Sequence, residues 1–149
     1  MISIRLADPD ANDSQGLLDE LSAVLVEITG DSGQASFDAG DVRASNARFV
    51  VARDADGNEL GCGAFRPLQS GAAEIKRMYS RPGTTGVGTA ILSFLEAEAR
   101  RLGYRVLRLE TRLVNQRAVI FYERKGYQRI QNYGKYAGNP KAVCFEKLL

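Results

Sequence analysis

Three consecutive stretches with the apolar pattern of β-strands restrict the fold of this chain more than any other feature. They are separated by turn-forming residues and comprise Phe49–Val51, Leu60–Leu68 and Ala72–Ser80. The Asp56-Gly57 pair between the first two is typical of a tight β-hairpin. Because short connections of this kind join antiparallel neighbours, the sequence predicts a three-stranded antiparallel meander.

A glycine-rich turn and an amphipathic helix follow the third stretch directly. Three glycines lie within Gly83–Gly88, and from Val87 to Leu102 the apolar residues recur mostly three or four positions apart until Gly103. Another strand-like stretch, Val106–Thr111, comes next. A helix between two strands of one sheet forms a right-handed crossover and makes those strands parallel. The sequence therefore predicts a parallel strand pair beside the meander.

The remaining elements complete a mixed α/β fold. Helical periodicity predicts a helix over Leu17–Ile28 that ends at Gly30, and a short helix that runs to Gly126 with Asn115 as its N-cap. Further strands are predicted at Ile2–Leu6, Tyr127–Ile130 and Ala142–Leu148. The stretch 31–45 is rich in turn residues and predicts only a short, weak helix. We therefore expect a mixed, mostly antiparallel central sheet flanked by helices.

Length and composition narrow the class of protein. A chain of 149 residues is expected to form one domain, residues 1–149. Its 20 basic and 18 acidic residues form no basic block, so no nucleic-acid partner is expected, and no apolar stretch suggests a membrane span. Cys62 and Cys144 lack metal-ligand spacing, which predicts buried free thiols, no metal and a cytoplasmic location. Histidine is absent, so proton transfer must use carboxylate, tyrosine, lysine or cysteine.

Two segments carry residues suited to chemistry. Glu74 lies in an otherwise apolar strand, where burying a carboxylate costs free energy unless the charge is required; a solvent-facing position is the alternative. The glycines at the start of the following helix leave backbone N–H groups accessible to a phosphate, although glycines there also suit a tight turn and close helix packing. The Gly-Lys-Ser/Thr of a P-loop is missing, and the order Gly83-x-x-Gly86-x-Gly88 reverses the dinucleotide-binding pattern.

The order of elements and three motifs together resemble the GCN5-related N-acetyltransferases over nearly the whole chain. Ala73-Glu74-Ile75 resembles the strand on which many members carry a general base. Gly86-Val87-Gly88 resembles the end of the family's Q/R-x-x-G-x-G/A pyrophosphate motif. Asn115-x-x-Ala118-x-x-Phe121-Tyr122 resembles the segment that holds the pantetheine arm of coenzyme A.

This resemblance implies the acyl-CoA N-acyltransferase fold and acetyl transfer from acetyl-CoA to an amine. Glu74 would accept the amine proton, and Tyr122 would protonate the leaving thiolate, with Tyr79 as the weaker alternative. A backbone N–H near Met78 would face the developing oxyanion. The residues implied in binding acetyl-CoA are Met78, Tyr79, Ser80, Thr84, Thr85, Gly86, Val87, Gly88, Thr89, Asn115, Ala118 and Phe121.

One departure from the family pattern concerns the diphosphate. The family's Gln or Arg would fall at Gly83, which has no side chain. Arg81 and Thr84 are the candidates to replace it, and the backbone amides from Thr85 to Thr89 could also serve alone.

Three functions stay open at this point. The first is N-acetylation of a small-molecule or amino-acid-like primary amine. The second is acetylation of a protein terminus or lysine, which should require an acidic groove or peptide slot, and the third is non-catalytic acyl-CoA binding, which the presence of both Glu74 and Tyr122 disfavours. Tyr133–Pro140 is either the wall of a small acceptor pocket or an ordered hairpin loop. The apolar last strand could pair across a homodimer interface.

Overall fold

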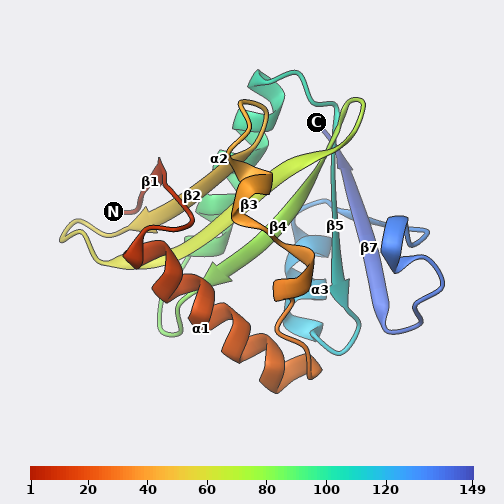
Figure 1. The fold of residues 1–149 in the computed structure, drawn as a ribbon, viewed down its shortest axis with the longest axis horizontal. Coiled ribbons are helices and arrows are strands. Elements are labelled where there is room, and N and C mark those ends of the chain that lie inside the picture. Colours follow the sequence, from red (N-terminus) through yellow and green to blue (C-terminus); the bar gives the residue numbers. More distant parts are fainter.

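A seven-stranded sheet carries helices on both faces in the computed structural model, which describes residues 1–149 (Figure 1). The strands lie in the order β1-β2-β3-β4-β5-β7-β6. They comprise β1 (Ser3–Leu6), β2 (Arg48–Arg53), β3 (Glu59–Gln69), β4 (Ala72–Ser80), β5 (Val106–Arg112), β6 (Gln128–Ile130) and β7 (Ala142–Leu148). The helices are α1 (Asn12–Thr29), α2 (Val87–Arg101) and α3 (Gln116–Arg124), with short 3-10 turns η1 (Gln34–Ser36), η2 (Ala39–Val42) and η3 (Gly134–Tyr136).

The pairing of β4 with β5 is the one parallel contact in the sheet. It runs from Ala72 opposite Val106 only as far as Glu74 opposite Arg108. Both strands continue beyond that point, β4 to Ser80 and β5 to Arg112, without pairing to each other. The sheet is therefore open between the carboxyl-terminal halves of these two strands.

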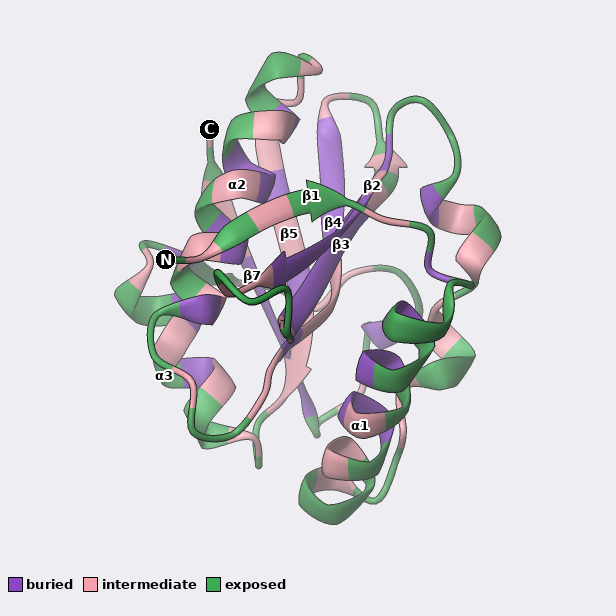
Figure 2. Cartoon of the chain, turned by 90° about the vertical axis from the view of Figure 1, so that its left-hand side faces the viewer, coloured by how far each residue is buried: buried purple, intermediate pink, exposed green.

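The two faces of the sheet carry separate apolar cores. Val50 and Ala52 of β2 pack with α2 and α3, whereas Phe49 and Val51, which point the opposite way, pack with α1. This is the alternation expected of a strand buried on both faces. Figure 2 shows the buried residues of α1 facing the sheet and its exposed residues facing outward.

A β-bulge interrupts β4 where it leaves β5. Cys62 of β3 lies opposite Tyr79 and Ala64 opposite Lys76, so three steps along β4 match two along β3. Arg77 lies in this bulge with φ 54, the one non-glycine residue with positive φ. A bulge changes which face the following side chains meet. Lys76 and Tyr79 therefore point to the α1 side of the sheet, while Met78 between them packs against the α2 side.

The structure confirms the predicted fold class. Every predicted helix and strand is present within a few residues of its expected bounds, including the parallel pair joined through α2. α1 begins earlier than its apolar pattern, at Asn12, and ends at Gly30 in the left-handed conformation. The stretch 31–45 contains two 3-10 turns. No helix has both the length and the apolar character needed to cross a bilayer.

Candidate active site

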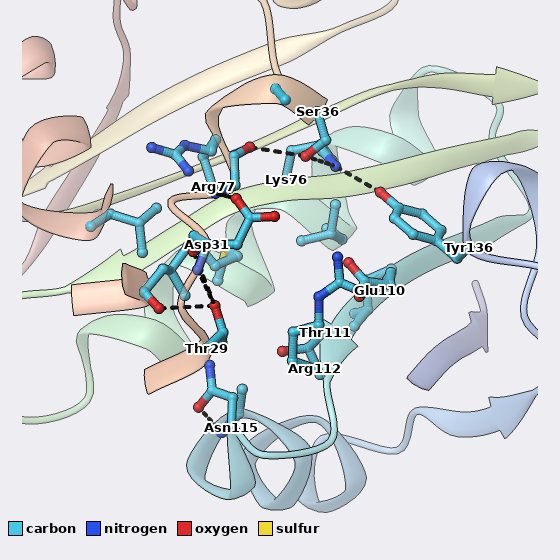
Figure 3. Close-up of a pocket in the computed structure, with 18 of the residues that line it drawn as sticks. Thr29, Asp31, Ser36, Lys76, Arg77, Glu110, Thr111, Arg112, Asn115 and Tyr136 are labelled. Atoms are coloured by element: carbon cyan, nitrogen blue, oxygen red, sulfur yellow. Dashed lines mark hydrogen bonds and ion pairs between the residues drawn. The ribbon is translucent and has the colours of Figure 1, made fainter. Parts of the chain in front are cut away.

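A cavity of about 220 Å³ lies where β4 and β5 are no longer paired. Its walls come from both strands, from the start of α3, from the end of α1 with the following turn, and from η3 (Figure 3). The lining residues on the two strands are Ile75, Lys76, Arg77, Met78, Leu109, Glu110, Thr111 and Arg112. The opening between the strands thus produces a chamber inside the sheet layer.

The N-terminus of α2 is not part of the cavity lining but lies close to α3, which is. Gly86 is its N-cap, with φ 75, and no side chain caps the helix. The first N–H groups of a helix have no acceptor within it, so the amides of Val87, Gly88 and Thr89 are available to an anion. Gly88 is also packed closely, since an added Cβ would lie 3.3 Å from Ser80 Oγ and 3.4 Å from Phe121 Cζ. Both interpretations of the glycine turn, anion approach and close packing, therefore fit the geometry.

Neither candidate replacement for the missing Gln or Arg is free. The Arg81 guanidinium donates to both carboxylate oxygens of Glu20, at 3.0 and 2.8 Å, and to the carbonyl of Glu59. The Thr84 hydroxyl donates to the carbonyl of Arg81 at 2.6 Å. A diphosphate at this turn would accordingly meet backbone amides rather than these two side chains.

Asn115 caps α3 as the sequence predicted. Its side-chain oxygen accepts from the Ala118 N–H at 3.3 Å, and both residues line the cavity (Figure 3). Tyr122 lies one turn further along α3 and also lines the cavity. Burial raises the pKa of the Tyr122 phenol, and its hydroxyl makes no hydrogen bond within the protein. It is a neutral hydroxyl held at the cavity wall.

The other residues implied in binding acetyl-CoA have different surroundings. Met78 lines the cavity, and Val87 is buried in the α2 core. Thr85 and Thr89 are exposed. The Tyr79 hydroxyl donates to Glu20 at 3.0 Å on the α1 side, so only its backbone is left for a contact at the cavity.

Glu74 is buried, with 2% of its surface exposed, and its carboxylate accepts hydrogen bonds from two neighbouring segments. Arg66 donates to Oε1 at 3.0 and 3.2 Å, and the Tyr133 hydroxyl donates to Oε2 at 2.7 Å. The prediction that this carboxylate is not a solvent-facing strand residue is therefore confirmed. Glu74 does not itself line the cavity.

A second carboxylate, Glu110, does line the cavity. Its side chain is 12% exposed, and burial raises its pKa. Arg112 Nη1 lies 3.3 Å from its Oε2, but both of these buried atoms lack a hydrogen bond. Neither Glu110 nor Arg112 was predicted from the sequence as a site residue. The alternation of Leu107 and Leu109 with charged residues along β5 did indicate that the charged side chains share one face.

Lys76 faces Glu110 from the neighbouring strand (Figure 3). Its ammonium donates to Ser36 Oγ and to the Tyr136 hydroxyl, each at 3.1 Å. Burial lowers the pKa of Lys76 to about 8. Tyr136 closes this end of the cavity from η3. Of the segment Tyr133–Pro140, Lys135 and Tyr136 therefore line the cavity, and that the cavity takes the acceptor stays a prediction.

Comparisons with known proteins identify the family and the fold of this chain. The chain matches the acetyltransferase (GNAT) family over residues 15–127. An IAA acetyltransferase of Azospirillum brasilense is 30% identical over 136 residues, which cover 89% of this chain and 88% of that protein. A Klebsiella pneumoniae protein assigned to the acyl-CoA N-acyltransferases has a similar structure, with TM-score 0.86, 29% identity and coverage of 100% of this chain and 98% of that one. A GNAT acetyltransferase of Staphylococcus aureus shares the fold, with TM-score 0.79, 16% identity and coverage of 100% and 99%.

Proposed function

Because the chain belongs to the GNAT family and is an acyl-CoA-dependent acetyltransferase, we propose that it acetylates the primary amine of a small molecule within the cavity between β4 and β5. The observation that carries the proposal is the continuity of this cavity. At one end it is lined by Asn115, Ala118 and Tyr122, and at the other by Lys76 and Glu110. An acyl donor and an amine can therefore meet in one continuous cavity.

The donor is acetyl-CoA, which supplies a thioester carbonyl that an amine can attack. The free amides at the start of α2 would bind its diphosphate, and Asn115 would hold its pantetheine arm. The new C–N bond forms as the C–S bond breaks, and the ammonium proton must leave the acceptor. Tyr122 would give its proton to the departing sulfur, which is a task for a hydroxyl that is neutral at pH 7.

The proton of the acceptor needs a carboxylate, because amines with a pKa of ~10 are mostly protonated at neutral pH. Glu74, nominated from the sequence, stays a prediction; to act directly it would have to exchange its bond with Tyr133 for the amine. Glu110 already faces the cavity, and neither of its oxygens accepts a hydrogen bond from the protein. We therefore place the direct proton transfer on Glu110 and keep Glu74 as the alternative.

The charge of the cavity supports a small acceptor over a protein. A peptide lysine or terminus would be favoured by an acidic groove, whereas the lining contains four cationic side chains and two carboxylates: Lys76, Arg77, Arg112, Lys135, Asp31 and Glu110. Non-catalytic binding of acyl-CoA is disfavoured because both an unbonded carboxylate and the Tyr122 hydroxyl line the same space.

A coupled thiol-release assay with acetyl-CoA tests the proposal. The acceptor panel would contain simple amines, amino acids, polyamines and short peptides, and calorimetric titration would measure acetyl-CoA binding separately. We expect turnover with small amines and little with peptides. Tyr122→Phe keeps the ring, so it should lower kcat by roughly 10²-fold or more without changing acetyl-CoA affinity. Acetyl-CoA binding without turnover of any amine would contradict the enzymatic role.

A further inference from the structure

The acceptor end of the cavity holds more charged groups than proton transfer requires. Lys76, Arg77 and Lys135 line it without a carboxylate within ion-pair distance, and Arg112 has one partner, Glu110. Lys76, Arg77 and Arg112 are half-buried and Lys135 is exposed; partial burial of a cation favours a nearby anion, because removing an unpaired charge from water costs free energy. The surplus of positive charge therefore points to an anionic group that is not part of the protein.

Among these cations, Arg77 has a structural role, which its hydrogen bonds show. Its guanidinium donates to Ser22 Oγ at 2.6 Å, to the Leu18 carbonyl at 3.2 Å and to the Ser32 carbonyl at 3.0 Å. These bonds tie α1 and the turn after it to the bulge of β4. Arg77 is thus a positioning residue for the wall of the cavity.

Lys76 has no comparable structural explanation. Its two partners, Ser36 and Tyr136, are neutral hydroxyl groups. An ammonium has three N–H donors, so one remains for a ligand in the cavity. Both hydroxyls hold the ammonium at the point where β4, η1 and η3 meet, which fixes its position without neutralising it.

Glu110 and Arg112 form the complementary part of the same surface. Their facing atoms are buried and 3.3 Å apart, yet neither atom makes a hydrogen bond. Lys76 and Glu110 are close enough for each charge to affect the other's titration. Figure 3 shows Glu110 and Arg112 next to each other on β5, and Lys76 on the neighbouring strand with its ammonium toward Ser36 and Tyr136. The Glu110 carboxylate and the cationic side chains of Lys76 and Arg112 therefore line the same small chamber.

We propose that this chamber recognises an acceptor that carries a carboxylate as well as a primary amine, with Glu110 binding the ammonium group and Lys76 binding the carboxylate. The inference rests on the proposed acetyltransferase function and names its substrate class, a small zwitterionic amino acid. Lys135, on the exposed η3 turn, adds positive charge near the same carboxylate. One ammonium proton passes to Glu110, and the amine nitrogen then bonds to the acetyl carbon as the C–S bond breaks. The departing thiolate takes a proton from Tyr122, and the second proton of the nitrogen returns to the Tyr122 oxygen, which balances the transfer.

The test compares each proteinogenic L-amino acid with its own carboxamide in the thiol-release assay. The carboxamide keeps the size and the amine but removes the negative charge. A charge-assisted hydrogen bond contributes enough to change kcat/KM by about 10- to 100-fold. We therefore expect at least one free amino acid to exceed its carboxamide by that factor. This comparison uses the unaltered protein, so it does not depend on whether any variant folds.

Lys76→Met should remove the preference by lowering kcat/KM for the free acid only, and Lys76→Arg should retain most of it. Lys141→Met, at an exposed lysine outside the cavity, is the matched control. Equal turnover of acids and carboxamides by a protein that acetylates amines would overturn this inference while leaving the acetyltransferase proposal intact. Failure to bind acetyl-CoA or to acetylate any amine would instead refute the proposed function.

Discussion

The two ends of the cavity are built in different ways. The proposed donor site combines the uncapped start of α2 at Gly86, outside the cavity lining, with the capping residue Asn115, and both are set by local backbone geometry. The acceptor end consists of side chains from β4, β5, η1 and η3, which are far apart in the chain. A short motif can specify the first kind of site, whereas the second exists only when the sheet has assembled. The proposed donor site can therefore be recognised from short motifs, whereas the proposed acceptor site depends on the assembled sheet.

The largest effect is expected at the acceptor end, when the carboxylate proposed as the base is replaced. Glu110→Gln keeps the size of the side chain but not its ability to accept a proton, so we expect kcat to fall by roughly 10² to 10⁴ at pH 7. Higher pH should partly rescue the variant, because more of the acceptor amine is then neutral. Acetyl-CoA affinity, measured by calorimetry, should not change.

Glu74→Gln is the matched control for that experiment. Glu74 is bound to Arg66 and Tyr133 and lies outside the cavity wall, so its replacement should lower the melting temperature more than it lowers kcat. The reverse order, with the larger kcat loss in Glu74→Gln and a pH rescue there, would return the role of base to Glu74.

A valine at Gly88 tests the donor end. The added side chain would press on Ser80 and on Phe121 at 3.3 to 3.4 Å and would cover the helix amides. We expect acetyl-CoA affinity to fall by at least about 10-fold, which corresponds to ~1.4 kcal/mol. Gly16→Val, in an open position of α1, controls for the loss of a helical glycine. An unchanged dissociation constant in a folded Gly88→Val protein would refute the assignment of the diphosphate to this turn.

The pH dependence of acceptor recognition sharpens the comparison further. The pKa of Lys76, about 8 because of burial, means that its ammonium loses its charge above that pH. The parent protein should then lose its advantage over Lys76→Met for an amino-acid acceptor, whereas Lys76→Arg should keep it. The ionisable groups whose charges act on Lys76 are Glu74, Arg66, Lys135 and Glu110. The measurement is kcat/KM of all three proteins from pH 6 to 9.5; a constant ratio between them would argue against a charged role for Lys76.

The smallest effects are expected at Asn115, where two substitutions distinguish its role as the cap of α3 from its proposed contact with acetyl-CoA. Asn115→Ala removes the bond to the Ala118 N–H and should cost about 1 kcal/mol of stability. Asn115→Asp preserves the cap but loses an amide donor, so it should keep the parental melting temperature and bind acetyl-CoA more weakly. Equal affinity in the Asp variant and the parent would leave Asn115 with a structural role only.

Much of the fold could be predicted because its signals are local. Apolar periodicity located α1 and α2, and glycine and asparagine marked helix ends at Gly30 and Asn115. The position of β7 between β5 and β6 could not be predicted in this way, because strand order depends on long-range pairing. The same limit applies to the site: nothing near Glu110 in the sequence reveals that Lys76 and Tyr136 will face it.

Glu74 illustrates how a correct local inference can leave a role open. Its position in an apolar strand correctly indicated a buried carboxylate with a specific requirement. The partner that satisfies it, Arg66, lies opposite Glu74 on β3 and is visible only in the strand register. Sequence reasoning could therefore detect the need for a charge, but not whether a substrate or another side chain fulfils it.

The bulge at Arg77 divides β4 into two half-strands in series, each with its own inside-outside pattern. In a regular strand Lys76, Met78 and Ser80 would share a face. Here Lys76 stays on the side of α1, while Met78 and Ser80 turn toward α2. Under the proposed function, side chains on the two faces of this one strand would lie next to the acceptor and next to acetyl-CoA, respectively. A substitution at Lys76 would then change the acceptor side of the cavity without altering the orientation of Met78 and Ser80, so acceptor specificity could change independently of acetyl-CoA binding.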